Sequence, residues 1–134
     1  KNSSVRKALD LTEEWEKATA AKGEKTSLAQ GCLIVRTEFL EAHPNAVKAF
    51  LAAYKESVDF VNGNTEKAAQ MIADAGIVPN AQIAAKALPN CNIVCLTGDE
   101  LKTNASAYLQ VLFDADPKAV GGAMPGDDFY WTAE

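Results

Sequence analysis

The sequence predicts a helix-rich α/β fold, and three observations support this prediction. Residues 31–36 form an apolar run in which Leu33, Ile34 and Val35 are consecutive, which is typical of a short strand buried on both faces of a parallel sheet. A long helical pattern follows this run directly. Several more helical patterns follow, but only two further short strands or extended segments are indicated, at residues 8–11 and 93–96. The chain therefore supplies many helices and few strands for them to cover.

The predicted helix after the apolar run begins in two steps. Thr37 offers a side-chain oxygen as the N-cap of a first short helix, and Glu38 suits its first turn. Pro44 then restarts the helix at a position where no amide hydrogen is needed. From there to Asn62 one apolar stripe recurs at helical spacing: Val47, Phe50, Leu51, Tyr54, Val58 and Val61.

The other predicted helices are indicated by capping residues at their starts and by glycine or proline at their ends. In order, they are a helix capped by Asp10 or Thr12 and ending at Gly23, one capped by Asn64 or Thr65 and ending at Gly76, one capped by Asn80 and ending before Pro89, and one capped by Thr97. A further turn opens at Asp116-Pro117. Beyond it the aromatic residues of the tail, Phe129, Tyr130 and Trp131, are expected to dock on the body of the protein.

Composition narrows the class of protein. The chain has 134 residues, 48% of them hydrophobic, which is enough for one domain with a core. Its net charge of −5 argues against nucleic acid as a partner. No segment approaches the length of a membrane helix. Because the first residue is Lys1 rather than Met, we expect a processed or excised chain, with any targeting sequence upstream.

The residues that usually carry chemistry are sparse. The three cysteines, Cys32, Cys91 and Cys95, are an odd number and are interpreted as small buried apolar residues, although a Cys91–Cys95 bridge is an alternative. The single histidine, His43, suits a helix start better than a metal site, so no metal or other cofactor is predicted. No phosphate-binding loop, nucleophile elbow or dinucleotide motif is present. The chain is therefore interpreted as a binding protein, not an enzyme.

One loop gathers short polar groups next to the predicted strand. Thr26, Ser27, Gln30 and the open backbone of Gly31 offer neutral donors and acceptors that would suit a small polar ligand. The same loop is equally a plain connection, which its spacing favours. Trp15, on the first predicted helix, is either a packing residue or a platform on which a flat ligand stacks.

Several segments resemble one family. Residues 31–54, GCLIVRTEFLEAHPNAVKAFLAAY, resemble the strand, R-x-x-F and P-x-x-V-x-x-F-L segment of periplasmic-type solute-binding proteins. More narrowly, they resemble the nitrate/sulfonate/taurine class of ABC importers, including pyrimidine-precursor-binder-like relatives. Residues 62–72, NGNTEKAAQMI, are similar to the family's N-x-x-x-E-x-A-x-x-I helix. Residues 87–94, ALPNCNIV, and residues 126–131, GDDFYW, resemble a branch found in Gram-positive bacteria.

The resemblance implies part of a two-lobed, periplasmic-binding-protein-like fold of type II. Two α/β lobes are joined by two crossing strands, and the ligand lies in the cleft between the lobes. Residues 31–36 would be the returning crossover strand, residues 1–30 the end of the second lobe, and residues 37–134 the helical C-terminal part of the first lobe. At this length the chain is expected to be the C-terminal part of a longer protein.

The function implied by the resemblance is that of the solute-binding component of an ABC importer. Such a protein captures a small molecule by hinge closure and delivers it to the membrane subunits of the transporter. Its location would be the extracellular face of the membrane, as a lipoprotein, or the periplasm. The expected ligand-binding residues are Ser27, Gln30 and Gly31, with Asn90 and Trp15 behind them. Alone, the fragment is expected to bind ligand weakly or not at all and to self-associate through its unfilled sheet face.

Two alternatives stay open at this stage. Menaquinone-pathway and thiamine-pyrimidine enzymes share the fold, and a catalytic histidine or acid–base pair in the cleft would distinguish them. The other alternative is a helical protein-interaction module whose exposed apolar face meets a partner.

Overall fold

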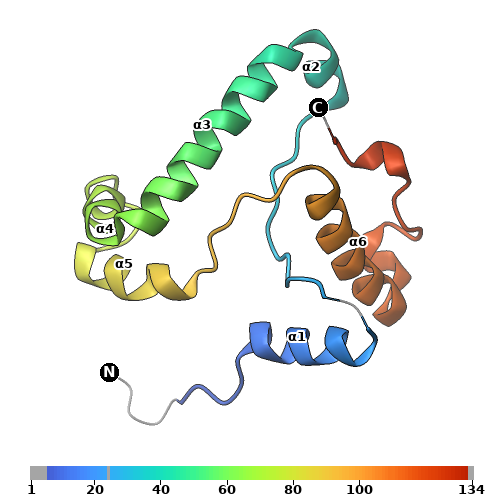
Figure 1. Cartoon of the computed structure of the whole chain (residues 1–134), viewed down its shortest axis with the longest axis horizontal. Coiled ribbons are helices and arrows are strands. Elements are labelled where there is room, and N and C mark those ends of the chain that lie inside the picture. The colour runs from blue at the N-terminus through green and yellow to red at the C-terminus, as the bar shows by residue number, and fades with distance from the viewer. Residues whose placement is uncertain (1–5, 24, 133–134) are drawn as a thin grey trace. The chain divides into compact units, whose positions relative to one another are not determined.

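A computed structural model describes residues 6–23 and 25–132 of the chain. All of the regular secondary structure in these residues is helical (Figure 1). The elements in order are α1 Leu11–Ala21, α2 Thr37–Ala42, α3 Pro44–Gly63, α4 Thr65–Asp74, α5 Ala81–Ala87, the 3-10 turn η1 Leu88–Asn90, α6 Gly98–Ala115, and the 3-10 turns η2 Pro117–Val120 and η3 Asp127–Phe129. The chain divides into two compact units, one made of residues up to Leu33 and from Leu96 onward, the other of Ile34–Cys95.

The unit Ile34–Cys95 contains α2 to η1 and buries the apolar residues of its helices. α4 packs closely on α5, and α3 packs on α4. Small residues at the contact allow the close approach of helix backbones, and the buried apolar residues are Val47 and Val58 of α3, Ala68 and Ala69 of α4, and Ala84 of α5.

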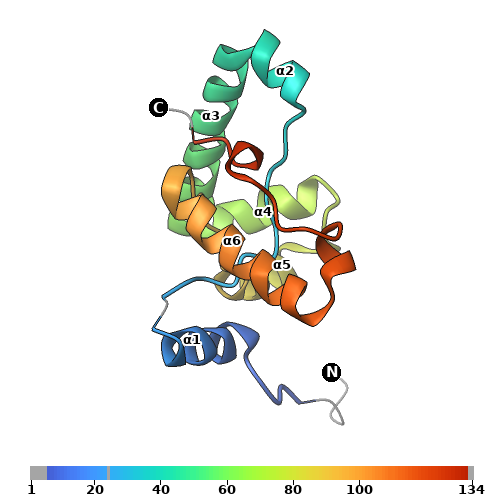
Figure 2. The ribbon, with the colours of Figure 1, turned by 90° about the vertical axis from the view of Figure 1, so that its right-hand side faces the viewer.

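The other unit contains α1, α6 and the tail. Its buried residues, Thr19 of α1 and Asn104 of α6, are both polar. The tail runs back alongside α6 (Figures 1 and 2), where the Ser106 hydroxyl donates to the Tyr130 hydroxyl at 3.0 Å. Lys102, one turn before Ser106 on α6, pairs with Asp127 at 2.9 Å. The prediction that the tail aromatics dock is thus confirmed for Tyr130, whereas Phe129 is 61% exposed.

The buried strand predicted over residues 31–36 does not form within the described residues. These residues are extended, but no ladder pairs them within the described part of the chain. Leu33 is 50% exposed, Ile34 87% and Val35 40%. A strand is defined by its hydrogen-bonded neighbour, and the other two candidates supply none: residues 93–96 are unpaired, and residues 8–11 lead into α1 without forming a strand. Helix-richness is therefore confirmed, while the sheet of the predicted α/β fold is absent from residues 6–23 and 25–132.

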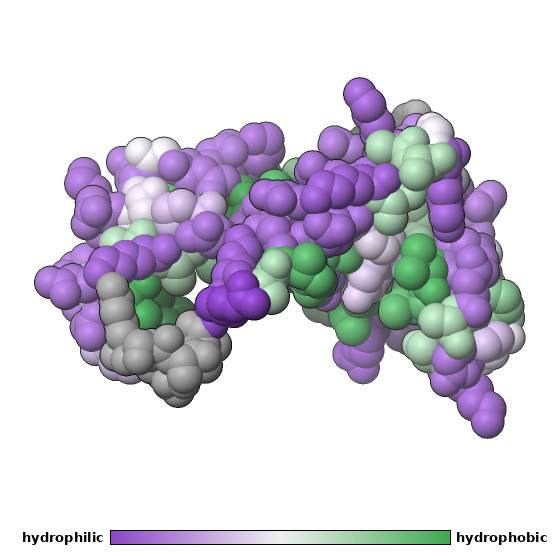
Figure 3. Space-filling model, turned by 90° about the horizontal axis from the view of Figure 1, so that it is seen from below, coloured by the Kyte–Doolittle hydropathy of each residue, from purple (hydrophilic) through white to green (hydrophobic). Residues whose placement is uncertain are grey.

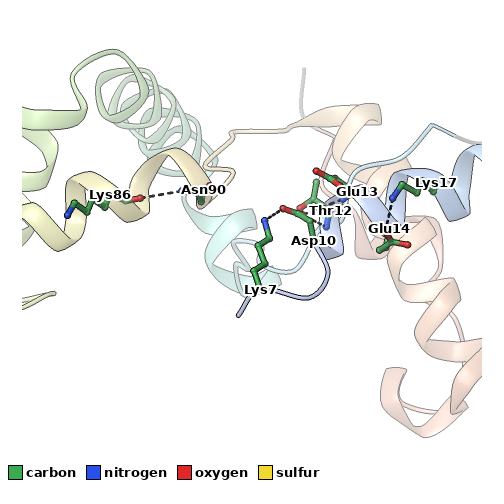
Figure 4. A network of polar contacts seen from close by, with 8 residues as sticks. All are labelled: Lys7, Asp10, Thr12, Glu13, Glu14, Lys17, Lys86 and Asn90. Atoms are coloured by element: carbon green, nitrogen blue, oxygen red, sulfur yellow. Dashed lines mark hydrogen bonds and ion pairs between the residues drawn. The ribbon is translucent and has the colours of Figure 1, made fainter. Parts of the chain in front are cut away.

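Helix boundaries follow the local signals closely. Asp10 caps α1 by accepting from the N–H of Thr12 at 3.0 Å, and Asn80 caps α5 by accepting from the N–H of Ile83 at 3.0 Å (Figure 4 shows the Asp10 cap). Pro44 occupies the first turn of α3, and Gly76 follows α4 with φ of 71°. The two helix caps that were predicted at threonine residues differ from the prediction.

Arg36, not Thr37, is the N-cap of α2, and it makes no side-chain capping bond. Thr97 does occupy the N-cap position of α6, but its side chain makes no capping bond either. Both helices begin without the side-chain hydrogen bond that the sequence predicted for them.

The chain exposes an unusually large surface for its mass. Its accessible surface is 10238 Å² at 14.3 kDa. A folded monomer of this mass exposes about 6,800 Å², and two independent globules of half the mass together expose about 8,200 Å². The excess includes large apolar side chains, visible in green among hydrophilic residues in Figure 3. These apolar side chains are suited to contacts beyond those made within the described residues. No helix among these residues is long and apolar enough to cross a membrane.

Candidate functional site

The polar loop that the sequence singles out is held between α1 and α6. The indole N–H of Trp15 donates to the carbonyl oxygen of Thr26 at 3.0 Å and to its hydroxyl at 3.3 Å. The backbone N–H of Ser27 donates to the side-chain carbonyl of Asn104 on α6. Two neighbouring residues of the loop are thereby held in place, Thr26 by α1 and Ser27 by α6.

The side-chain amide of Asn104 is hydrogen-bonded at both its oxygen and its nitrogen. Asn104 is 7% exposed, and its amide group donates to the carbonyl of Glu100, one turn earlier on α6, at 2.8 Å. Its acceptor faces Ser27 and its donor faces its own helix, so the buried amide has partners at both ends. A buried amide with both ends bonded holds its partner in one position, which makes Asn104 an anchor of the loop.

Trp15 acts here as a packing residue. Its ring lies against that of Tyr108 on α6, with centroids 5.8 Å apart and planes tilted by 54°. Its backbone carbonyl accepts from the hydroxyl of Thr19, which is 6% exposed. Since the indole N–H is already bonded to Thr26 and the ring contacts Tyr108, the structure favours the packing interpretation of Trp15 over the stacking platform.

The predicted ligand-contacting residues of the loop lie on its open side. Ser27, Gln30 and Gly31 are all exposed. A Cβ built on Gly31 would meet no atom within 4 Å, so the backbone there is open to an incoming group. These three residues and Trp15 belong to the same compact unit. The three loop residues lie within a stretch of five residues in the sequence. The structure thus places them on one segment with free space beside it.

The fifth predicted residue lies elsewhere. Asn90 ends η1 in the unit Ile34–Cys95, is exposed, and donates to the carbonyl of Lys86 at 3.3 Å (Figure 4). Asn90 and the loop residues therefore do not form one site within either unit.

The electrostatics of the described residues consist of surface ion pairs. A side-chain hydrogen bond to Asp127 raises the pKa of Lys102, and the same bond lowers the pKa of Asp127. Lys7 and Asp10 pair in the same way, with the pKa of the lysine raised and that of the carboxyl lowered (Figure 4). These shifts belong to exposed pairs and not to a buried acid–base group, so they mark no catalytic centre.

No group of histidine, cysteine and carboxylate side chains suited to a metal ion occurs among residues 6–23 and 25–132. All three cysteines are free thiols. The prediction that they are buried is wrong for Cys32 and Cys91, which are exposed, while Cys95 is half-buried. Cys32 is exposed for the same reason as Leu33: the run that carries both has no neighbouring strand to cover it.

Sequence reasoning missed the two residues of α6 that hold the loop. Asn104 and Tyr108 lie one turn apart on α6, on the same helix face as the apolar Leu101. The signal was present, because an asparagine in the middle of an apolar helix face needs a hydrogen-bonding partner. Its partner, Ser27, lies 77 residues away in the chain, a distance that local patterns do not bridge.

Comparison with known proteins adds no relative: no family model, curated protein or solved structure matches the chain.

Proposed function

We propose that the chain is the C-terminal part of the solute-binding component of an ABC importer of the nitrate/sulfonate/taurine type. In this proposal it belongs to a two-lobed α/β fold of type II and takes part in capturing a small molecule by hinge closure. The observation that carries the proposal is the extended apolar segment 31–36, which joins two compact units and leaves its side chains exposed.

The exposed apolar segment supports the proposal because a soluble protein rarely leaves such a run uncovered. Leu33, Ile34 and Val35 follow one another without a polar residue, and each is at least 40% exposed. Consecutive apolar residues are typical of strands that are covered on both faces. A sheet supplied by the remainder of a larger protein would bury this segment and satisfy its backbone.

The connectivity also supports the proposal. The boundaries of the two compact units fall at Leu33–Ile34 and at Cys95–Leu96, each within an extended stretch. Hinge closure, the motion that capture needs, takes place about a few loop residues that join two compact bodies, and the two connections would serve as such segments. A ligand shifts such an equilibrium only by the difference between its affinities for the closed and open states.

The proposed partners and location follow from this function. The ligand would be a small molecule contacted by Ser27, Gln30 and Gly31, and Trp15 would hold the loop in place through its bond to Thr26. The membrane subunits of the importer would recognise the closed protein. The protein would work on the extracellular face of a Gram-positive membrane as a lipoprotein, or in a periplasm.

A ligand screen of the complete protein tests the proposal. Sulfonates, pyrimidines and aromatic acids are added one class at a time, and the melting temperature is measured. Binding to the native state alone stabilises it, by about 2.7 kcal/mol when the ligand is at 100 times its dissociation constant. We expect one class to raise the melting temperature. If no class does so, the proposal of solute binding is wrong.

The loop is tested with a matched pair of glutamine variants. Gln30→Ala removes an exposed amide of the loop, whereas Gln110→Ala removes an exposed amide of the same unit that bonds to Asp114 on α6. We expect Gln30→Ala to reduce the ligand-induced shift and Gln110→Ala to keep it. Equal shifts in both variants would refute the loop as the binding site but leave solute binding itself intact.

A helical protein-interaction module is the second candidate, and one observation favours it. α3 leaves two large apolar side chains uncovered: Phe50, within the predicted apolar stripe, is 55% exposed, and Phe60, outside that stripe, is 38% exposed. A helix that is apolar on more than one side is usually packed against other structure on more than one side. Light scattering after size-exclusion chromatography distinguishes the candidates: the complete solute-binding protein is expected to be monomeric, whereas a module that uses this face is expected to oligomerise or bind a protein partner.

A further inference from the structure

Two asparagines hold the two connections between the compact units. In the unit that contains α6, Asn104 accepts from the backbone N–H of Ser27, on the first connection. In the unit Ile34–Cys95, the side-chain amide of Asn62 at the end of α3 donates to the carbonyl of Ile93, on the second connection, at 2.9 Å. Each asparagine therefore belongs to the unit in which its connection is anchored.

We propose that Asn62 and Asn104 are positioning residues that set where each connection leaves its unit, so that the segments free to bend are residues 28–36 and 94–97. This inference rests on the proposed hinge closure. It assigns the limits of the hinge, which the family resemblance does not supply.

The bonds that the two asparagines make are unlike the other asparagine bonds to backbone. Asn64 and Asn90 each donate to a carbonyl four residues earlier, so those bonds stay within one turn of chain. The bonds of Asn62 and Asn104 span 31 and 77 residues. A bond across so many residues fixes the path of a connection, while a bond within one turn only closes a helix end.

The two connections differ in free length, and the shorter one limits the motion. Residues 28–36 extend from the clamped Ser27 to the start of α2 at Thr37. Residues 94–97 extend from the clamped Ile93 to the start of α6 at Gly98. Four extended residues reach about 14 Å. Release of Ile93 lengthens this segment by that residue, which would extend its reach by about 3.5 Å.

The test uses one substitution at two asparagines that make the same kind of bond. Asn62→Asp keeps the shape of the side chain but removes the N–H donor that reaches Ile93. Asn90→Asp is the matched control, because it makes the same chemical change at an amide that donates only to Lys86 of its own turn. Nitroxide labels are placed on the exposed positions Thr103 of α6 and Lys67 of α4, in a chain whose three cysteines are replaced by serine.

Pulsed electron-electron resonance then gives the distribution of distances between the labels, without ligand. We expect Asn62→Asp to extend the upper end of the distribution by up to about 3.5 Å, the reach that one residue adds. We expect Asn90→Asp to leave the distribution unchanged. If Asn62→Asp leaves it unchanged, or if both variants widen it equally, the assignment of Asn62 is overturned.

Hydrogen exchange tests the bond between Asn104 and Ser27. It also keeps the inference testable if Asn62→Asp loses its helical circular dichroism and is therefore unfolded. In the unmodified chain, the amide of Ser27 should be protected and those of residues 28–36 and 94–97 should not. Asn104→Ala should reduce the protection of the Ser27 amide about tenfold, the factor that one hydrogen bond typically contributes. Protection of residues 94–97, or an unprotected Ser27, would overturn the inference. Both measurements are made without ligand, so a negative ligand screen leaves their outcome unaffected.

Discussion

The rings of Trp15 and Tyr108 meet with their centroids 5.8 Å apart and thereby join α1 to α6. The indole N–H of Trp15 is bonded to Thr26 at the same time. The two roles can be separated by substitution. Trp15→Phe keeps a ring against Tyr108 and loses the hydrogen bond, and is expected to cost about 1 kcal/mol of stability. Trp15→Ala loses both and is expected to cost about 3 kcal/mol. Urea unfolding measures both values, and equal costs would show that the ring contact contributes nothing.

The N-cap of α5 gives a second prediction. Asn80 accepts from the N–H of Ile83, whereas Thr97 occupies the same position of α6 without such a bond. Asn80→Ala is therefore expected to destabilise the chain by about 1 kcal/mol. Thr97→Ala is expected to cost less than about 0.5 kcal/mol, the usual range of an uninvolved surface position. Urea midpoints compare the two variants, and the reverse order of costs would contradict the cap assignment.

Two glycines give opposite expectations for alanine. A Cβ on Gly31 meets no atom within 4 Å, and the residue is not in the left-handed region. Gly31→Ala is expected to change stability by less than about 0.5 kcal/mol. Gly76 closes α4 with φ of 71°, so Gly76→Ala should cost about 1 kcal/mol or more. A Gly31→Ala variant of normal stability that binds ligand more weakly would place the ligand at the loop.

The ion pair between the tail and α6 predicts a pH dependence. The hydrogen bond from Lys102 lowers the pKa of Asp127 from its ordinary value of 3.8. A carboxyl whose pKa is lowered by folding stabilises the native state above its unfolded pKa, and this contribution is lost as the pH falls through the folded pKa. On the acid side, the tail contact should therefore weaken below about pH 4.

Carboxyl titration by nuclear magnetic resonance measures this pKa. Lys102→Met should return the pKa of Asp127 toward its ordinary value, and the control Lys118→Met should not. An Asp127 pKa that is the same with and without Lys102 would show that the pair does not form in solution.

The cysteines predict a reactivity order. Cys32 and Cys91 are exposed, whereas Cys95 is half-buried. A thiol reagent such as Ellman's reagent should therefore modify two thiols quickly and the third more slowly, and all three at one rate in denaturant. Serine variants at each position assign the phases. A total below three thiols under reducing-agent-free conditions would indicate a disulfide, which the structure does not contain among its described residues.

Local signals predicted most helix boundaries correctly. The cap at Asn80, the proline at the start of α3 and the glycine after α4 all act through atoms within four residues, so their effect is readable from neighbouring sequence. Thr37 and Thr97 show the limit of such signals. Their residue type suits a cap, but whether the hydroxyl turns toward the helix depends on the path of the incoming chain.

The residues alone predicted the helix-rich character, the order of the helices and the apolar nature of segment 31–36. Periodicity and capping are properties of short stretches of chain, so they can be read from the sequence. The three-dimensional arrangement was needed to show that no strand among the described residues lies beside this segment and that Asn104 reaches Ser27. Pairing in a sheet and the bonding of a buried amide depend on partners tens of residues away. No pattern within a single stretch records which of the distant partners is present.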